Sequence, residues 1–250
     1  MKSWQKKYLD RFYPASAGWK NGTEEFHDLC RSVIGSGSKI LEIGPGPNNG
    51  TSRFLATLGE LHGLDPDPEI SHNEALTSAS VLVGDRFPFD DASFDACVSD
   101  YVLEHVRNPL AQLAEVARVL RPGGIYVFRT PNRWHYVSLV AALTPHWFHG
   151  LVVHRLRGRS AEERHDPYPT FFRLNSRGAV AQFAPVAGLQ IESLRLVEKE
   201  PSYGMAGRGF FLAFMAYERA VNSSDRLAPF RANLFAVLKK PAAGSSAHGG

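Results

Sequence analysis

Residues 38–50 read Ser-Lys-Ile-Leu-Glu-Ile-Gly-Pro-Gly-Pro-Asn-Asn-Gly, a run typical of a buried strand that enters a glycine-rich turn. Gly44 and Gly46 carry no Cβ, so the chain can turn sharply there and a ligand can approach the bare backbone. The helix expected after the turn points its amide groups at the same place. The spacing is Gly-x-Gly-x-x-x-Gly, which differs from that of dinucleotide-binding turns, and an acidic Glu42 precedes it. The stretch therefore predicts a strand, a tight turn and a helix that together bind a ligand.

Short apolar runs alternate with helical patterns along the rest of the chain, which favours an open α/β sheet. Strands are expected at residues 39–43, 60–64, 80–84, 94–99, 124–129, 189–197 and 233–238. Helices are expected at residues 110–120, where Arg-Pro-Gly-Gly follows, at 176–188 with Ser176 as the cap, and at 210–221. We therefore predict a seven-stranded, mostly parallel sheet with helices on both faces.

The pattern predicts one domain over residues 1–240. Within it, residues 1–35 are expected to form a helical lid over the ligand, and the aromatic-rich residues 131–175 an insertion that caps the substrate. Residues 241–250 are rich in Ala, Gly and Ser, which predicts a disordered tail.

Composition narrows the classes of function. The net charge of +3 over 250 residues is far below the dense basic footprint of a nucleic-acid-binding protein, so we expect a small-molecule substrate and no nucleic acid. Cys30 and Cys97 give neither a disulfide framework nor a metal-ligand spacing. No apolar run approaches the ~20 residues needed to cross a bilayer. These features favour a cytoplasmic protein without a bound metal.

Two aspartates follow the second and third expected strands. Asp65 lies about 20 residues beyond the glycine turn, where a carboxylate can accept hydrogen bonds from both hydroxyls of a ribose. Asp85 ends the third expected strand, where it could accept from an adenine amino group while Arg86 and Phe87 flank the ring. Each aspartate can also be read as an ordinary turn residue. Their order and spacing favour the functional interpretation.

These motifs together resemble those of class I S-adenosylmethionine-dependent methyltransferases, in the small-molecule (type 11) group that includes quinone-pathway enzymes. The resemblance covers roughly residues 38–130. It is carried by Leu41-Glu42-Ile43-Gly44-Pro45-Gly46, Gly63-Leu64-Asp65, Gly84-Asp85, Phe94-Asp95-Ala96-Cys97-Val98-Ser99, Leu103-Glu104-His105-Val106 and Leu120-Arg121-Pro122-Gly123-Gly124.

The resemblance implies a Rossmann-like fold and S-adenosylmethionine as the methyl donor. It places Glu42, Gly44 and Gly46 along the methionine part of the cofactor and Asp65 at its ribose. It places Asp85 with Arg86 at the adenine, and Asp100 and Tyr101, which follow Ser99, beside the sulfonium methyl group.

Methyl transfer from a sulfonium is an in-line displacement, so a base is needed only where the acceptor must lose a proton. We expect an oxygen acceptor, with His105 or His135 as the base, although either histidine could instead make a structural hydrogen bond. Methylation of nitrogen or carbon, on a small molecule or a lipid-linked intermediate, is the alternative.

The apolar residues 136–153 precede four arginines at 155, 157, 159 and 164, which suits an amphiphilic or anionic acceptor, or a peripheral contact with a lipid surface. A cap with a solvated basic rim is the other interpretation. We expect a monomer or a homodimer. Two other classes of function remain: a nicotinamide dehydrogenase, which the displaced third glycine disfavours, and a non-catalytic module that binds S-adenosylmethionine.

Overall fold

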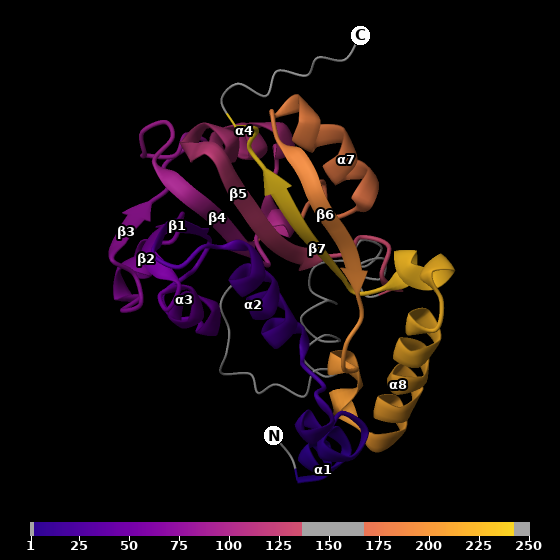
Figure 1. The fold of residues 1–250 in the computed structure, drawn as a ribbon. Coiled ribbons are helices and arrows are strands. Elements are labelled where there is room, and N and C mark those ends of the chain that lie inside the picture. The colour runs from indigo at the N-terminus through magenta and orange to yellow at the C-terminus, as the bar shows by residue number, and fades with distance from the viewer. Residues whose placement is uncertain (1–2, 137–167, 243–250) are drawn as a thin grey trace. The chain divides into compact units, whose positions relative to one another are not determined.

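A seven-stranded sheet forms the centre of the fold in the computed structural model, which describes residues 3–136 and 168–242 (Figure 1). The strand order is β3-β2-β1-β4-β5-β7-β6. The strands are β1 (Ser38–Ile43), β2 (Gly59–Asp65), β3 (Ser78–Val81), β4 (Phe94–Asp100), β5 (Leu120–Pro131), β6 (Gln190–Val197) and β7 (Asn233–Lys239). The predicted sheet is confirmed. Most of the predicted cap, at residues 137–167, and most of the tail, at 243–250, lie outside the described residues.

The central strands run in parallel, β1 with β2 and β4, β2 with β3, and β4 with β5. At the carboxyl end of β1, Ile43 pairs with Leu64 of β2 and with Ser99 of β4. The residues that follow these three strands therefore meet at one edge of the sheet, which is where open α/β sheets bind ligands.

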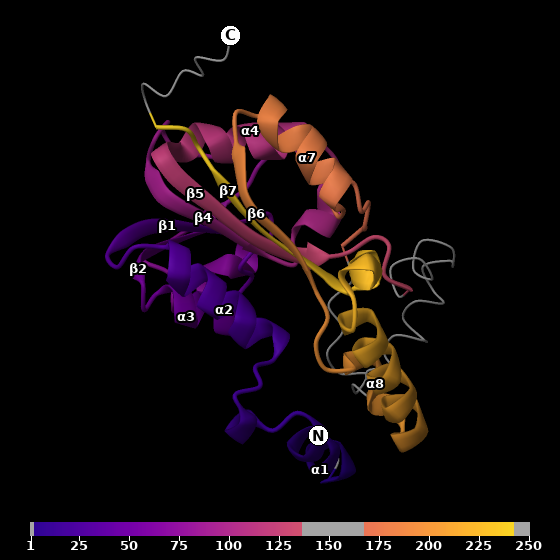
Figure 2. The same cartoon turned by 45° about the vertical axis from the view of Figure 1, so that its right-hand side comes forward.

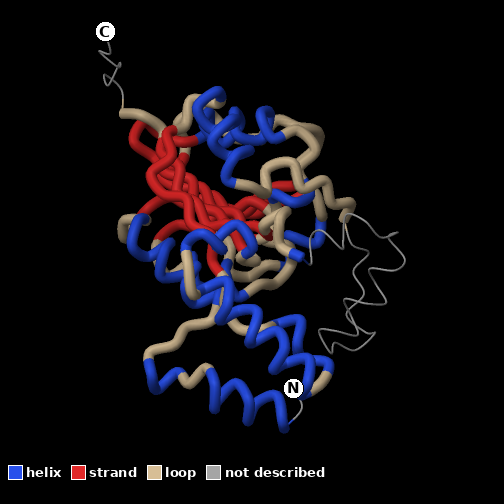
Figure 3. The backbone as a smooth tube through the Cα atoms, turned by 90° about the vertical axis from the view of Figure 1, so that its right-hand side faces the viewer, coloured by secondary structure: helices blue, strands red, loops and turns tan. Residues whose placement is uncertain are grey.

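Helices cover both faces of the sheet, as predicted. Helices α4 (Pro109–Val119) and α7 (Arg177–Val186) lie on one face, and α2 (Gly22–Val33) and α3 (Gly50–Leu55) on the other (Figures 1 and 2). Ser176 caps α7 as expected, because its hydroxyl accepts the N–H of Ala179 at 3.2 Å. Figure 3 shows the strands enclosed between helices. In the part of the chain that the structure describes, no helix is both long and apolar enough to span a bilayer.

The chain divides into two compact units. The larger contains the described parts of Phe26–Thr130, Thr170–Arg195 and Leu234–Gly250, and so holds nearly all of the sheet. The smaller contains the described parts of Met1–Glu25, Pro131–Pro169 and Leu196–Asn233, including α1 (Ser3–Phe12) and α8 (Arg208–Asn222).

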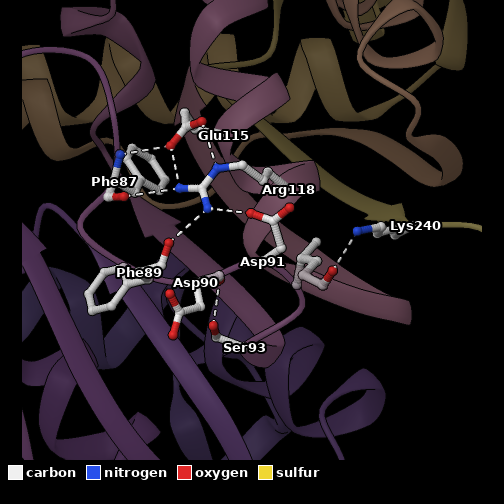
Figure 4. Close-up of polar contacts among 9 residues, drawn as sticks. Phe87, Phe89, Asp90, Asp91, Ser93, Glu115, Arg118 and Lys240 are labelled. Carbon is white, nitrogen blue, oxygen red and sulfur yellow. Dashed lines mark hydrogen bonds and ion pairs between the residues drawn. The ribbon is translucent and has the colours of Figure 1, made fainter.

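Arg118 near the end of α4 holds the loop that connects β3 to β4 (Figure 4). Its guanidinium donates to the carbonyl oxygens of Phe87 (3.0 Å) and Phe89 (2.7 Å) and to the carboxylates of Glu115 (2.7 and 2.9 Å) and Asp91 (2.8 Å). Glu115 in turn accepts the N–H of Phe87 at 2.7 Å. A planar fork with five donors can make this set of contacts, and a lysine ammonium cannot.

We expect Arg118→Lys to lower the free energy of unfolding by about 2 kcal/mol, because charge-assisted hydrogen bonds to Glu115 and to the carbonyl oxygens of Phe87 and Phe89, all partly buried, are lost. Chemical denaturation measures the change. The matched control is Arg121→Lys, which removes the fork from an ion pair with Asp95 whose side chains are 48% and 38% exposed. It should cost well under ~1 kcal/mol. Equal losses in the two variants would contradict the role assigned to Arg118.

Candidate functional site

The turn after β1 uses two glycines in left-handed conformations. Gly44 has φ +74° and Gly46 has φ +62°, which L side chains rarely adopt. A Cβ on Gly44 would collide with a methyl group of Val102, whereas a Cβ on Gly46 would meet nothing within 4 Å. The first glycine is therefore required by close packing, and the second borders open space beside the loop.

Asp65 at the end of β2 fixes this turn. Its Oδ2 accepts the N–H of Gly46 at 2.9 Å, and its Oδ1 accepts the N–H of Asp67 at 2.9 Å. The side-chain amide of Asn73 donates to the carbonyl oxygen of Gly46 at 3.0 Å and to Ser52 Oγ at 3.1 Å. Both the backbone N–H and the backbone carbonyl of Gly46 are thus hydrogen-bonded. No sequence motif pointed to Asn73.

Asp65 is only 6% exposed, and both of its carboxylate oxygens accept a backbone N–H. A carboxylate oxygen has two lone pairs, so each can accept one further bond. The predicted contact with a ribose stays a prediction, and the structure adds a second role for Asp65 in shaping the loop.

Glu42 near the end of β1 is buried, with 1% of its surface exposed. The amide of Asn49 lies 3.4 Å from Oε1, while Oε2 has no hydrogen-bond partner among residues 3–136 and 168–242. The pKa of Glu42 is raised to about 7, chiefly by burial and to a smaller extent by the nearby carboxylates of Asp100 and Asp65, while polar contacts with Ser52 and Asn49 partly oppose the rise. A buried acceptor that the described residues leave without a donor is a candidate contact for a donor group of a ligand.

Asn49 closes the loop that follows Gly46. Its side-chain oxygen accepts the N–H of Ser52 at 2.7 Å and so caps α3, while its amide donates to the carbonyl oxygen of Pro45 at 2.6 Å. The sequence carries a signal for this role, because asparagine is a preferred cap before a helix.

Asp100 at the end of β4 is engaged by the protein itself. The guanidinium of Arg129, from β5, pairs with both of its carboxylate oxygens, and Nη2 lies 2.8 Å from Oδ2. Thr51 Oγ1 donates to the same Oδ2 at 2.7 Å and lies 3.2 Å from His27 Nε2. Burial, followed by the charge of Arg129, lowers the pKa of His27. No sequence motif pointed to Arg129, Thr51 or His27. The predicted cofactor contact of Asp100 stays a prediction.

Tyr101 is one of few non-glycine residues with a left-handed backbone, at φ +59°. Its N–H donates to the carbonyl oxygen of Arg129 at 3.0 Å, and the guanidinium of Arg129 lies 4.7 Å from the centre of its ring. The side chain is 40% exposed. Such backbone strain is typical of functional sites, so the conformation supports the site predicted here.

Asp85 and Arg86 lie in the loop after β3, because that strand ends at Val81 rather than at Gly84. Both residues are exposed. The expectation that Phe87 flanks a ligand is wrong, because its ring is 1% exposed and belongs to the core. The predicted adenine contacts therefore rest on Asp85 and Arg86 alone.

The two candidate bases lie in different units. His105 ends the short 3₁₀ helix η3 (Leu103–His105), in the larger unit with the glycine turn, and is partly exposed. The preceding Glu104 is 6% exposed and accepts a hydrogen bond from Thr130 Oγ1 at 3.0 Å, and burial raises its pKa.

His135 belongs to the smaller unit and is 3% exposed. Its Nε2 lies 3.6 Å from Glu198 Oε2, and its ring lies beside those of Tyr136 and Tyr217. Burial lowers the pKa of His135 to about 4 and raises that of Glu198 to about 8. The two groups therefore face each other uncharged near neutral pH, although their distance falls within the range of an ion pair.

Comparison with known proteins points to the region that contains the glycine turn. A family model described as a methyltransferase domain matches residues 41–128. A relative from Mycolicibacterium vanbaalenii, described as an uncharacterized methyltransferase, is 35% identical over 164 residues, which are 62% of this chain and 60% of the relative. The chain thus aligns with about 60% of the length of this relative.

Two solved structures show the same fold at low sequence identity. The complex between the Haloferax volcanii Trm112 methyltransferase activator and a putative methyltransferase gives a TM-score of 0.56 at 18% identity, covering 96% of this chain and 95% of that one. A putative sarcosine dimethylglycine methyltransferase from Galdieria sulphuraria gives 0.56 at 16% identity, covering 88% and 85%. Residues 41–128 thus resemble a methyltransferase domain, and the chain shares the fold of the two solved structures.

Proposed function

We propose that the chain transfers the methyl group of S-adenosylmethionine to an oxygen atom of a small organic acceptor. The observation that carries this proposal is the buried Oε2 of Glu42, which the described residues leave without a hydrogen-bond partner, beside the turn that Asp65 fixes. The match of residues 41–128 to a methyltransferase domain supports S-adenosylmethionine as the methyl donor, and the nature of the acceptor is our inference from the residues.

The residues present fit the cofactor. The methionine part of S-adenosylmethionine carries an ammonium group, which is the donor that the unpartnered Glu42 Oε2 lacks. Open space at Gly46 would accept an extended chain beside the backbone. Asp65 retains lone pairs for ribose hydroxyls, and the exposed Asp85 and Arg86 would contact the adenine. When bound, S-adenosylmethionine supplies an electrophilic methyl group to the acceptor.

The contribution of the protein is to align the reactants. Because Gly46 is bonded at both its N–H and its carbonyl, the loop needs little reorganisation on binding. The ion pair of Asp100 with Arg129 fixes the backbone that precedes Tyr101, whose exposed ring borders the predicted methyl position. Positioning of this kind lowers the barrier of a displacement reaction without a chemical step by the protein.

A hydroxyl acceptor must lose a proton, and we propose His105 or His135 for this role. The two histidines differ in their surroundings. His105 is partly exposed and lies in the unit that contains the turn, whereas burial keeps His135 neutral at pH 7, which is the form of an imidazole that can accept a proton. Transfer to nitrogen or carbon, and cofactor binding without transfer, are the alternative functions.

Titration calorimetry with S-adenosylmethionine, S-adenosylhomocysteine and NAD tests the proposal, followed by an acceptor screen that measures S-adenosylhomocysteine. We expect the first two ligands to bind and NAD not to bind. His105→Ala or His135→Ala should lower kcat for a hydroxyl acceptor by about 100-fold, with a changed pH profile. Tight binding of NAD without binding of S-adenosylmethionine would contradict the proposed methyl donor. An unchanged kcat in both histidine variants across the pH range would contradict only the proposed role of a histidine as base.

Gly46→Ala should weaken S-adenosylmethionine binding by at least about tenfold, because a methyl group would enter the space where the cofactor lies against the backbone. Gly188→Ala is the matched control, since Gly188 also has a left-handed φ of +80° and open surroundings. Both variants should lose about 1 kcal/mol of folding stability. Equal cofactor affinity in the two variants would show that position 46 does not contact the ligand.

The affinity for S-adenosylmethionine should rise with pH up to about 7 and then level off. Glu42 is protonated below its pKa of about 7, and the ionised carboxylate is the form that pairs with an ammonium group, so binding must first remove the proton. Calorimetry between about pH 5.5 and pH 7.5, below the range near 7.7–8.0 in which an α-amino group loses its own proton, should show up to about a tenfold gain per pH unit below 7. Glu42→Gln should abolish this dependence. Glu69→Gln, an exposed control, should retain it.

A further inference from the structure

An aromatic cluster in the smaller unit fixes α1 against the start of α8. Phe211 is fully buried, and its ring centre lies 5.3 Å from that of Tyr8 and 6.4 Å from that of Trp4. The side-chain amide of Gln5 donates to the carbonyl oxygen of Met205 at 2.8 Å, just before α8 begins. This packing fixes the position of α1, and with it the position of the helix face that is exposed.

A pocket of about 340 Å³ lies on that face. It is lined by Ser3, Trp4, Lys7, Tyr8, Arg11 and Arg208. Ser3, Lys7 and Arg11 are spaced by four residues, so they share one side of α1, and Arg208 comes from the first turn of α8. The pocket therefore gathers three cationic side chains beside two aromatic rings and has no acidic residue in its lining.

The three cations have no carboxylate partner among the described residues. Lys7, Arg11 and Arg208 make no ion pair there, and the one contact of Arg11 is with the ring of Phe12, 5.2 Å away. Asp10 is the one acidic residue of α1, and it does not line the pocket. Three like charges that converge without a counter-charge repel one another, so an anion would stabilise the arrangement.

We propose that this pocket binds the phosphate group of a phosphate ester whose remaining part is apolar or aromatic. Two guanidinium forks and one ammonium offer enough donors for the three or four oxygens of a phosphate, more than a carboxylate can accept with its two oxygens. The faces of Trp4 and Tyr8 would take the apolar part. The pocket shares no residue with the glycine turn, so its ligand can be measured independently of the proposed methyl transfer.

Phenyl phosphate is the probe for the first experiment, titrated into the full chain by calorimetry at about 0.15 M salt. Lys7→Gln and Arg208→Gln should each weaken binding by about tenfold, because each removes charge-assisted hydrogen bonds. Lys6→Gln is the matched control: it removes the same charge from the neighbouring exposed position, which does not line the pocket. Its affinity should stay within about twofold of the unchanged chain.

Benzoate and lipid vesicles complete the design. Benzoate should bind at least about tenfold more weakly than phenyl phosphate.

Flotation with vesicles of phosphatidylcholine, with and without phosphatidylglycerol, distinguishes a lipid headgroup from a free ester. Binding only to the anionic vesicles, lost in Arg208→Gln, supports a lipid source, and phenyl phosphate binding without vesicle binding supports a soluble one. Equal losses in Lys6→Gln and Lys7→Gln, equal affinity for benzoate, or no binding of either probe would overturn the proposal.

Discussion

The hydrogen bond from the N–H of Gly46 to the carboxylate of Asp65 is the constraint on which the site depends. It joins the turn after β1 to the end of β2, and it does so where parallel pairing already aligns the two strands. With the turn fixed, Asn49 can cap α3 and Glu42 is enclosed beneath the loop. One carboxylate thus shapes the backbone that a ligand would approach, which explains why a short sequence motif can specify so much of the site.

Sequence reasoning succeeded where geometry is local or repeated. The glycine turn needs two left-handed residues, and Gly44 and Gly46 supply them. The apolar strands and the Ser176 cap follow from periodicity and from side-chain chemistry that acts within a few residues. The error at Phe87 arose because alternation along a strand does not reveal which ring is drawn into the core when the strand ends early, at Val81.

Contacts between segments that are distant in the chain could not be predicted from the sequence. Arg129 and Asp100 lie on neighbouring strands but are 29 residues apart, and nothing in either motif indicates their pairing. The same holds for Asn73 at Gly46 and for Arg118, whose fork binds a loop almost thirty residues earlier. Each is a charged or amide side chain that satisfies buried backbone or carboxylate groups, a need that appears only after the chain has folded.

The neutral pairing of His135 with Glu198 has a consequence for proton counting. Between about pH 4 and pH 8 the two groups hold a single proton, located on Glu198. An imidazolium facing a carboxylate would hold the same number, so the two charge states differ only in where that proton lies. A shift of the proton between them would therefore leave the total charge of the unit unchanged and release nothing to the solvent, and a titration that counts protons would not detect it.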